Sequence, residues 1–288
     1  MENSKSTVDF IRFKASDEVE LQGWLNNEAS DIAVVHIHGM SGNGYENYFL
    51  DTLRAMYAEH DVSLFTIDSR GRGIISDFRQ GDGWKHAGSC FELFEESAHD
   101  IRGAVDYLKS LGKTRFILQG HSLGCTKVVN FVLNGNVDGI EKVILLAPTD
   151  MTGWANTEPM HTEYLAKAKQ LLSEGKGEEL VDAQCWLDKT PISAQTYPTL
   201  CEAGSSADIY GERDGGSLIG RVELPMLIPY GSEDIGIIQI DGSMDKWLER
   251  VNAIKNDNTE IVVVDGASHG FKGFEDSLAE TIESFVSR

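Results

Sequence analysis

Basic residues are scarce in this 288-residue chain. It contains 25 Lys and Arg against 46 Asp and Glu, which gives a formal net charge of −21. A surface of this sign repels phosphate backbones and anionic bilayers, so the composition argues against nucleic-acid and membrane partners. The acidity would attract a cationic small molecule, and it would equally serve solubility alone.

Cysteines are few and long apolar runs are missing. No Cys-x-x-Cys spacing occurs, so neither a zinc site nor a disulfide framework is predicted for Cys90, Cys125, Cys185 and Cys201. No run approaches the roughly 18 apolar residues of a membrane-spanning helix. The first six residues lead into a strand-like segment without an apolar signal sequence. We therefore expect a cytoplasmic protein without a metal site.

The alternation of apolar patterns predicts an α/β fold. Two strand-like stretches at residues 8–13 and 19–25 are joined by a polar turn and predict an antiparallel hairpin. Apolar runs typical of strands buried on both faces follow at residues 32–37, 62–67, 115–118, 143–146, 226–228 and 261–264. Helical patterns at 45–59, 92–111 and 123–133 separate most of them. We expect a doubly wound, mostly parallel sheet flanked by helices.

The most informative motif is a pentapeptide centred on Ser122. Gly120-His121-Ser122-Leu123-Gly124 directly follows one predicted strand and leads into a helical pattern. Glycines on both sides of a serine permit a strained turn that leaves the hydroxyl exposed at a strand-to-helix junction. This context predicts that Ser122 is a nucleophile. The alternative is an ordinary loop in which Ser122 only caps the helix.

A serine nucleophile needs a base, and the base needs an orienting carboxylate. In folds with this elbow, the chain order is Ser, then Asp or Glu, then His. The strand at 226–228 runs into a loop that contains our candidate acid, Asp234, with Glu233 and the more distant Asp241 as competitors. The candidate base is His269, in a small-residue loop after the last predicted strand. As a neutral imidazole it would accept the serine proton and return it to the leaving group.

Two backbone N–H groups are expected to form an oxyanion hole. One belongs to Leu123, directly after the nucleophile, at the start of a helix whose dipole favours negative charge. The other is assigned to Met40, in the glycine-containing loop after the strand at 32–37. That loop completes neither G-x-G-x-x-G nor G-K-S/T, so we do not expect a nucleotide site.

Further residues are assigned to packing or to the walls of a substrate cavity. Arg70 is expected to pair with a carboxylate, and His36, His38 and His121 to be structural. Aromatic residues are more often core than cavity wall. With that alternative open, the candidates for substrate contact are Trp84, His86, Trp154, Trp186 and Tyr197.

An interval of almost eighty residues, between 146 and 226, lacks a convincing buried strand. It contains two amphipathic helical candidates, 162–174 and 178–188. We interpret residues 148–222 as an inserted, mainly helical cap, with residues 1–147 and 223–288 forming the core. Because open α/β sheets bind ligands at the carboxyl ends of their strands, we expect the cap to cover that edge.

Together these features resemble the α/β-hydrolase superfamily. The resemblance is carried by His38-Gly39, by the turn at residues 68–73, by the elbow at Ser122 and by the loops of Asp234 and His269. It covers the whole chain apart from the cap. It implies an eight-stranded sheet and hydrolysis through an acyl-enzyme, with no metal or organic cofactor. One departure is the acid loop, which reads Asp234-Ile235-Gly236-Ile237 where the family often has a proline.

The cap is similar to those of hydrolases related to fungal siderophore esterases and bacterial macrolide esterases. Residues 191–195 and 206–210 carry this likeness. Both groups act on esters inside large rings, and a macrolide bears a basic amino sugar. The cap contains twelve acidic and six basic residues, a net charge of −6 that suits a cation. We expect a serine esterase for a bulky, cationic cyclic ester such as a macrolide antibiotic, as an antibiotic-resistance enzyme. A general carboxylesterase, a siderophore-ester hydrolase, an acyltransferase and a non-catalytic binding protein are the alternatives.

Overall fold

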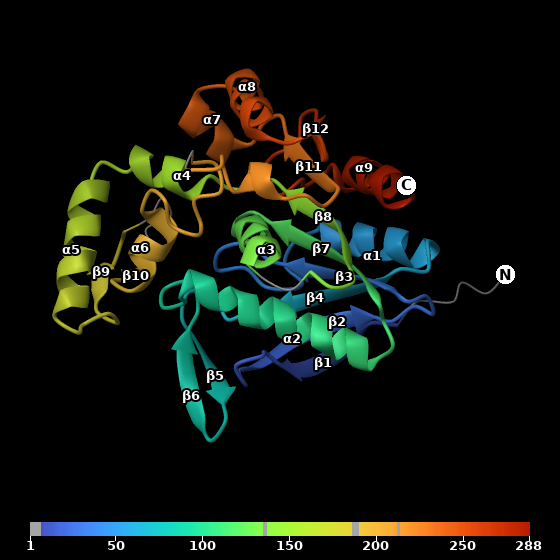
Figure 1. Cartoon of the computed structure of the whole chain (residues 1–288), viewed down its shortest axis with the longest axis horizontal. Coiled ribbons are helices and arrows are strands. Elements are labelled where there is room, and N and C mark those ends of the chain that lie inside the picture. Colours follow the sequence, from blue (N-terminus) through green and yellow to red (C-terminus); the bar gives the residue numbers. More distant parts are fainter. Residues whose placement is uncertain (1–6, 135–136, 186–189, 212–213) are drawn as a thin grey trace.

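A central eight-stranded sheet organises the computed structural model (Figure 1). The structure describes residues 7–134, 137–185, 190–211 and 214–288. The sheet consists of β1 (Asp9–Lys14), β2 (Glu20–Asn26), β3 (Ile32–Ile37), β4 (Ser63–Asp68), β7 (Arg115–His121), β8 (Ile140–Leu146), β11 (Met226–Gly231) and β12 (Thr259–Val264). Their order across the sheet is β1-β2-β4-β3-β7-β8-β11-β12. Only the β1–β2 and β2–β4 pairs are antiparallel, so the predicted sheet with its antiparallel start is confirmed.

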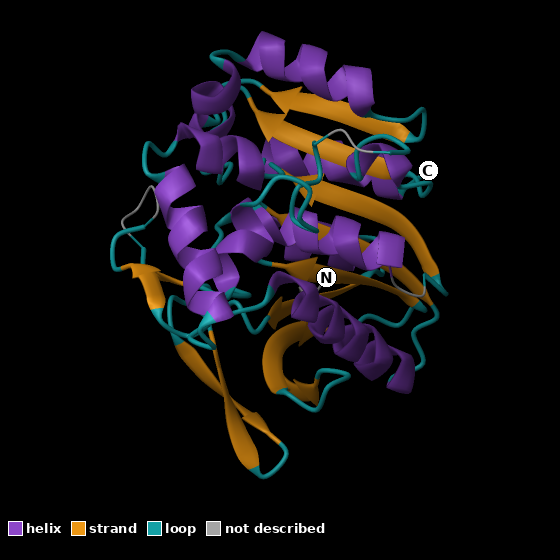
Figure 2. Cartoon of the chain, turned by 60° about the vertical axis from the view of Figure 1, so that its left-hand side comes forward, coloured by secondary structure: helices purple, strands orange, loops and turns teal. Residues whose placement is uncertain are grey.

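Helices cover both faces of the sheet (Figure 2). On one face lie α1 (Phe49–Glu59) and α9 (Glu275–Val286); on the other lie α2 (Ser97–Ser110), α3 (Leu123–Asn134) and α8 (Met244–Ile254). Side chains of a strand point alternately to the two faces, so Val34 packs with α1 while Val35 packs with α2 and α3. Burial on both faces explains the continuous apolar runs of the central strands. None of the described helices is long and apolar enough to cross a membrane.

The segment 148–222 holds small elements that gather at one end of the sheet, on the left of Figure 1. They are α4 (Met151–Thr157), α5 (His161–Ser173), β9 (Leu180–Asp182), β10 (Ile192–Ser193) and α6 (Thr196–Cys201). The segment also contains the 3₁₀ turn η2 (Ile219–Arg221), whose Ile219 packs in the core cluster. An apolar cluster joins α4, α5 and α6 to Leu123 of α3 and to Phe94 of the 3₁₀ turn η1 (Phe94–Glu96). Tyr210, in contrast, packs in the core cluster against Trp247. The division into core and cap stays a prediction.

The helix predicted at residues 178–188 is wrong over its described part. Residues 180–182 form β9, which pairs antiparallel with β10. Within β9 only Val181 is fully buried, between exposed Leu180 and half-buried Asp182. Three residues carry too little periodicity to distinguish a strand from one helical turn, and the partner strand supplies the deciding hydrogen bonds. Residues 186–188 of the prediction lie outside the described part of the chain.

A hairpin of β5 (Ser76–Gln80) and β6 (Gly83–Ala87) was not predicted. It projects from the body of the molecule at the bottom of Figure 2. Its two strands are joined by Gly81 and Asp82, and Gly81 has a positive φ of 57°. A Gly-Asp turn between short strands is a recognised hairpin signal, so the sequence did contain an indication of it.

Candidate active site

The elbow places Ser122 between β7 and α3 in a strained conformation. Ser122 has a positive φ of 55°, and its N–H donates to the carbonyl of Leu146 on the neighbouring strand at 3.0 Å. A Cβ atom on Gly120 would clash with the backbone of Gly124, and one on Gly124 would clash with the carbonyl of Ile37. The two glycines are therefore required because α3 begins so close to the ends of β3 and β7.

Asp234 and His269 are joined by a hydrogen bond. Asp234 follows β11 and caps α7 (Ile235–Asp241), where its Oδ1 accepts from the N–H of Gly236 at 3.0 Å. Its Oδ2 lies 2.8 Å from His269 Nδ1. Both oxygens of this buried carboxylate are thus engaged, and an ionised carboxylate only accepts hydrogen bonds. Nδ1 of His269 therefore carries a proton, which leaves Nε2 as the basic nitrogen.

The two competing carboxylates lie in other surroundings. Asp241, at the end of α7, binds the guanidinium of Arg250 through both oxygens, at 3.0 and 2.9 Å. Glu233 is next to Asp234, but within the described residues no hydrogen bond connects its side chain to His269. The geometry favours Asp234 as the partner of the imidazole.

The Ser122 hydroxyl has a partner that the sequence did not indicate. Its Oγ lies 2.9 Å from the hydroxyl of Thr149, the third residue after β8. His269 lines the same cavity as Ser122, yet within the described residues it makes no hydrogen bond to the Ser122 side chain. No motif singles out Thr149, because it reaches Ser122 only through the pairing of β7 with β8.

The loop after β3 lies against Ser122. Gly39, Met40 and Ser41 line a cavity of about 300 Å³ together with Ser122 and His269. A Cβ atom on Gly39 would come within 2.9 Å of the Ser122 Cβ, so glycine permits this close approach. In the described part of the chain, the N–H groups of Met40 and Leu123 have no hydrogen-bond acceptor. This arrangement fits the oxyanion-hole roles predicted for Met40 and Leu123.

Two buried histidines hold these loops. His38 donates from Nδ1 to the Gly39 carbonyl at 2.7 Å and accepts at Nε2 from the Ser69 N–H at 3.1 Å. Burial and the charge of a nearby lysine lower the pKa of His38 to about 4. His121 donates from Nε2 to the carbonyl of His269 at 3.0 Å, and burial beside His269 lowers its pKa to about 3. Both are neutral at pH 7, so they act as hydrogen-bonded supports.

A second, smaller cavity adjoins the first. Its volume is about 130 Å³, and its walls include Ile235, Ile237 and Ile240 of α7 together with Thr149. Trp154 of α4 lines both cavities, as does His269. The region beside the nucleophile is thus divided into an apolar compartment and a larger, more polar one.

The predicted substrate contacts separate into different places. Trp154 lines the cavity of Ser122. Trp84 and His86 lie on β6, and neither contributes to the described lining of that cavity. Tyr197 is fully buried in the apolar cluster of the 148–222 segment, and Trp186 lies outside the described residues. Within the described residues, no group of three or more His, Cys, Asp or Glu side chains could hold a metal ion.

Sequence comparisons identify relatives over part of the chain. The family model described as "Protein of unknown function (DUF1749)" matches residues 87–287. "Uncharacterized protein YfhR" of Escherichia coli K12 is 25% identical over 145 residues, which cover 48% of this chain and 46% of YfhR. "Esterase EstD" of Thermotoga maritima is 23% identical over 241 residues, covering 82% of this chain and 54% of EstD. The chain spans about half the length of the curated relatives it matches.

Solved structures share the fold over nearly the whole chain. Est1E from Butyrivibrio proteoclasticus, solved with bound ferulic acid, superimposes with a TM-score of 0.66 at 19% identity. The match covers 95% of this chain and 97% of Est1E. The α/β hydrolase GrgF from Penicillium sp. sh18 superimposes with a TM-score of 0.69 at 15% identity, and the match covers 98% of this chain and 98% of GrgF. The central sheet and its flanking helices are therefore those of the α/β-hydrolase fold. The family model matches more than half of this chain. The chain therefore belongs to the family "Protein of unknown function (DUF1749)".

Proposed function

We propose that this protein hydrolyses carboxylic esters through an acyl-enzyme formed on Ser122. The observation that carries the proposal is the 2.8 Å hydrogen bond between Asp234 and His269, beside a cavity that also contains Ser122 on a strained elbow. A relative and a structural neighbour that are named esterases, EstD and Pf2001 of Pyrococcus furiosus, support it. The neighbours alone would support only the fold.

These hydrogen bonds support a specific course for the proposed reaction. Ser122 first rotates from Thr149 towards His269, whose Nε2 accepts the hydroxyl proton as Oγ attacks the ester carbonyl. The N–H groups of Met40 and Leu123 stabilise the oxyanion. His269 then gives its proton to the departing alcohol, and water, deprotonated by the same nitrogen, releases the acid. Asp234 holds the imidazole in the required tautomer throughout.

The two compartments suggest how an ester is oriented. The 130 Å³ compartment with its isoleucine walls accepts a short apolar group. The 300 Å³ compartment, lined by Ser41 and Glu46 as well as Met40, accepts the bulkier and more polar part of the substrate. Trp154 stands between the two and limits the size of the smaller group.

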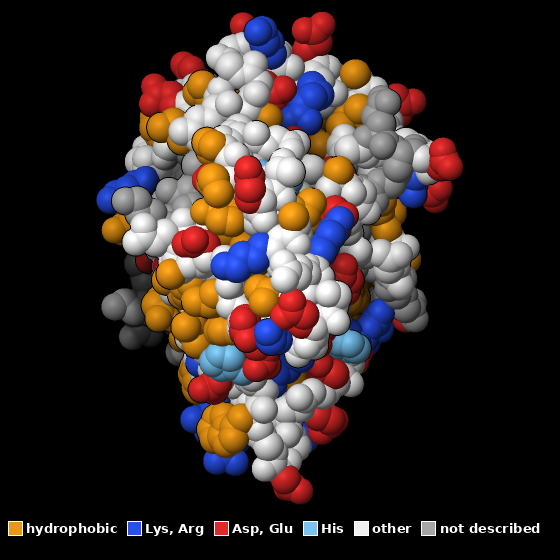
Figure 3. Space-filling model, turned by 90° about the vertical axis from the view of Figure 1, so that its left-hand side faces the viewer, with side chains coloured by type: hydrophobic (Ala, Val, Ile, Leu, Met, Phe, Trp, Pro, Cys, Tyr) orange, Lys and Arg blue, Asp and Glu red, His pale blue; other side chains and the backbone are white. Residues whose placement is uncertain are grey.

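The finer hypothesis is that the ester is a large cyclic one, a lactone such as a macrolide. Its support is the similarity of the 148–222 segment to siderophore- and macrolide-esterase caps, and the net charge of −6 over that segment. Acidic side chains are spread over the face in Figure 3, where they would favour a cationic ligand. A macrolide ring is larger than a cavity of about 300 Å³, so part of the ring would lie outside this cavity unless the 148–222 segment moves.

Labelling and product analysis test both levels. We expect a fluorophosphonate probe to label the wild type and Ser277→Ala, a matched control on the exposed face of α9, but not Ser122→Ala. Mass spectrometry of a mixture of simple esters, siderophore esters and macrolides should then show a gain of one water that depends on Ser122. Water addition only to simple or siderophore esters would remove the macrolide hypothesis. Absence of labelling would overturn the serine mechanism, and acyl transfer to an added alcohol without water addition would indicate an acyltransferase.

A further inference from the structure

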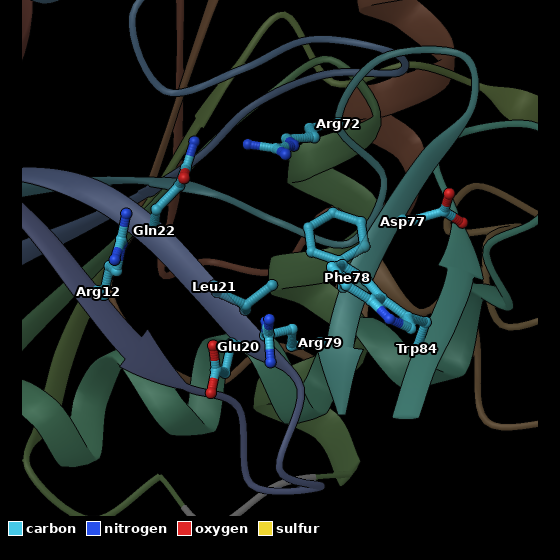
Figure 4. A pocket seen from close by; sticks show the side chains of 9 residues that line it. All are labelled: Arg12, Glu20, Leu21, Gln22, Arg72, Asp77, Phe78, Arg79 and Trp84. Atoms are coloured by element: carbon cyan, nitrogen blue, oxygen red, sulfur yellow. The ribbon is translucent and has the colours of Figure 1, made fainter. Parts of the chain in front are cut away.

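A separate cleft of about 310 Å³ lies between the β1–β2 hairpin and the β5–β6 hairpin (Figure 4). Its lining includes Arg12, Gln22, Arg72, Arg79 and Trp84, and it shares no lining residue with the cavity of Ser122. The side chains come from three parts of the chain that the fold brings together: the first hairpin, the turn after β4 and the projecting hairpin. The ester-hydrolysis mechanism uses none of them.

Three guanidinium groups line this cleft. Arg72 shares its charge with Asp68 at 3.0 Å. Arg12 and Arg79 have no carboxylate within ion-pair distance in the described part of the chain. The chain has 25 Lys and Arg against 46 Asp and Glu, so three guanidinium groups on one cleft are more than the composition leads one to expect.

The lining also contains two carboxylates, those of Asp77 and Glu20. Asp77 is hydrogen-bonded to His86 at 2.7 Å, and in Figure 4 its carboxylate points away from the centre of the cleft. Glu20 lies opposite Lys14 in the register of the β1–β2 hairpin, but Lys14 is ion-paired with Glu18 at 2.6 Å. Within the described residues, neither Asp77 nor Glu20 is ion-paired with Arg12 or Arg79. Both guanidinium groups therefore keep N–H donors for an anionic ligand.

An exposed indole ring stands beside these charges. Trp84 is 67% exposed, which is unusual for a residue that normally buries most of its surface. The guanidinium of Arg79 lies 5.1 Å from the centroid of the Trp84 ring. This cation–π contact favours the rotamer of Arg79 that keeps the guanidinium beside the ring. In Figure 3, hydrophobic surface bordered by basic side chains is visible at the lower end of the molecule, where the β5–β6 hairpin lies. The hairpin therefore presents an exposed indole ring and a guanidinium group side by side.

We propose that this cleft is a binding site for a small aromatic anion, a molecule with a planar ring and a carboxylate or phosphate group. The planar guanidinium of Arg79, with Arg12 on the opposite wall, binds the anionic group, because its fork of N–H donors matches carboxylate and phosphate oxygens. The ring stacks on Trp84. Trp84 is thereby reassigned from the ester site to a second site, whose ligand has the opposite charge to the cation expected at the cap.

Titration calorimetry of the 288-residue protein with phenylphosphonate tests the proposal, because this probe has the ring and the anion but no ester bond to hydrolyse. Methylphosphonate is the matched probe without a ring. We expect phenylphosphonate to bind the wild type, and to bind Arg79→Gln and Trp84→Leu at least about tenfold more weakly, the loss of one charge-assisted or stacking contact. Raised ionic strength should weaken binding, since the site is exposed.

The controls separate this site from other surfaces. Arg115→Gln removes an exposed arginine that pairs with Glu141 at the start of β7, and it should leave the affinity for phenylphosphonate unchanged. Arg12→Gln supplies a variant on a different strand should Arg79→Gln fail to fold. The proposal is overturned if phenylphosphonate shows no binding at low salt, if its affinity is the same in Arg79→Gln, Arg12→Gln and Trp84→Leu as in the wild type, or if methylphosphonate binds equally well.

Discussion

The hydroxyl oxygens of Ser122 and Thr149 lie 2.9 Å apart. Thr149 is almost fully buried and forms part of the wall of the apolar compartment. The Ser122 hydroxyl therefore rests against the segment that follows β8, and in the proposed mechanism it reaches His269 only after the side chain rotates. A rotation of this kind exchanges one hydrogen bond for another, so its free-energy cost is small.

Replacing Thr149 by valine tests this interpretation. Thr149→Val keeps the shape of the side chain and removes the hydroxyl. Because a neutral hydrogen bond contributes about 0.5–1.5 kcal/mol net, we expect kcat/KM for p-nitrophenyl acetate to stay within about tenfold of the wild type. A loss of several orders of magnitude would instead place the Thr149 hydroxyl among the groups needed for the chemistry.

The tautomer of His269 depends on Asp234. In Asp234→Asn, the amide can donate to Nδ1, which leaves the proton on Nε2 and removes the base. We expect kcat to fall by about 10⁴, the loss typical of this substitution in serine triads, with the fold unchanged by circular dichroism. Asp241→Asn is the matched control, because Asp241 binds Arg250, and it should retain most of the activity. Equal losses in the two variants would argue against the assigned acid.

Trp154 is expected to set the length of the acyl group. Trp154→Ala removes the wall between the two compartments, so the maximum of kcat/KM across p-nitrophenyl esters from acetate to octanoate should move to longer chains. Trp84→Ala changes an indole on the distant hairpin and should leave the chain-length profile unchanged. A shift of the maximum in both variants, or in neither, would refute the assignment of Trp154.

Acid should destabilise the protein through its buried histidines. The pKa is lowered to about 3 for His121 and to about 4 for His38, whereas an unfolded histidine titrates near 6.5. Above about pH 6.5, each of these histidines is neutral in both the folded and the unfolded protein. As the pH falls below about 6.5, only the unfolded chain takes up the proton. Each of these histidines therefore lowers the free energy of unfolding by about 1.4 kcal/mol for each pH unit between roughly pH 6.5 and pH 4.

Urea unfolding at pH 7 and pH 5 measures this dependence. His121→Asn removes one titrating group, so the free energy of unfolding should fall less between the two pH values in the variant than in the wild type. His60→Asn, which replaces an exposed histidine paired with Glu283, is the matched control and should keep the wild-type slope. An unchanged slope in His121→Asn would contradict the prediction.

A buried ion pair lies beneath the 148–222 segment. Lys127 of α3 and Glu92 are 2.6 Å apart, and both side chains are essentially inaccessible to solvent. Thr196 of α6 donates to the backbone carbonyl of Glu92 at 2.9 Å, so the pair lies at the junction with that segment. Lys127→Met leaves a buried carboxylate without its cation and should cost about 3–5 kcal/mol of stability in denaturant unfolding. The double variant Lys127→Met, Glu92→Leu should recover most of the lost stability. If it recovers none, packing and not charge causes the loss.

The sequence predicted those elements whose signal is local. Residues 32–37 form β3 as expected, because a strand buried on both faces is apolar at nearly every position, here at all but His36. The helix expected at 123–133 is α3, since its apolar spacing is long enough to define one face. Residues 180–182 carry a pattern too short to decide between helix and strand, and there the prediction was wrong.

The candidate site divides in the same way. The Ser122 elbow, and the order in which Asp234 and His269 follow it, are determined by the sequence alone, because turn sterics and strand ends are local properties. The tertiary structure decided which of the neighbouring carboxylates meets His269, that Thr149 contacts the Ser122 hydroxyl, and that Trp154 lines the cavity of Ser122 while Trp84 lines another cleft. These relationships join residues far apart in the chain, and they exist only once the sheet has set the strands in register and the helices have packed against it.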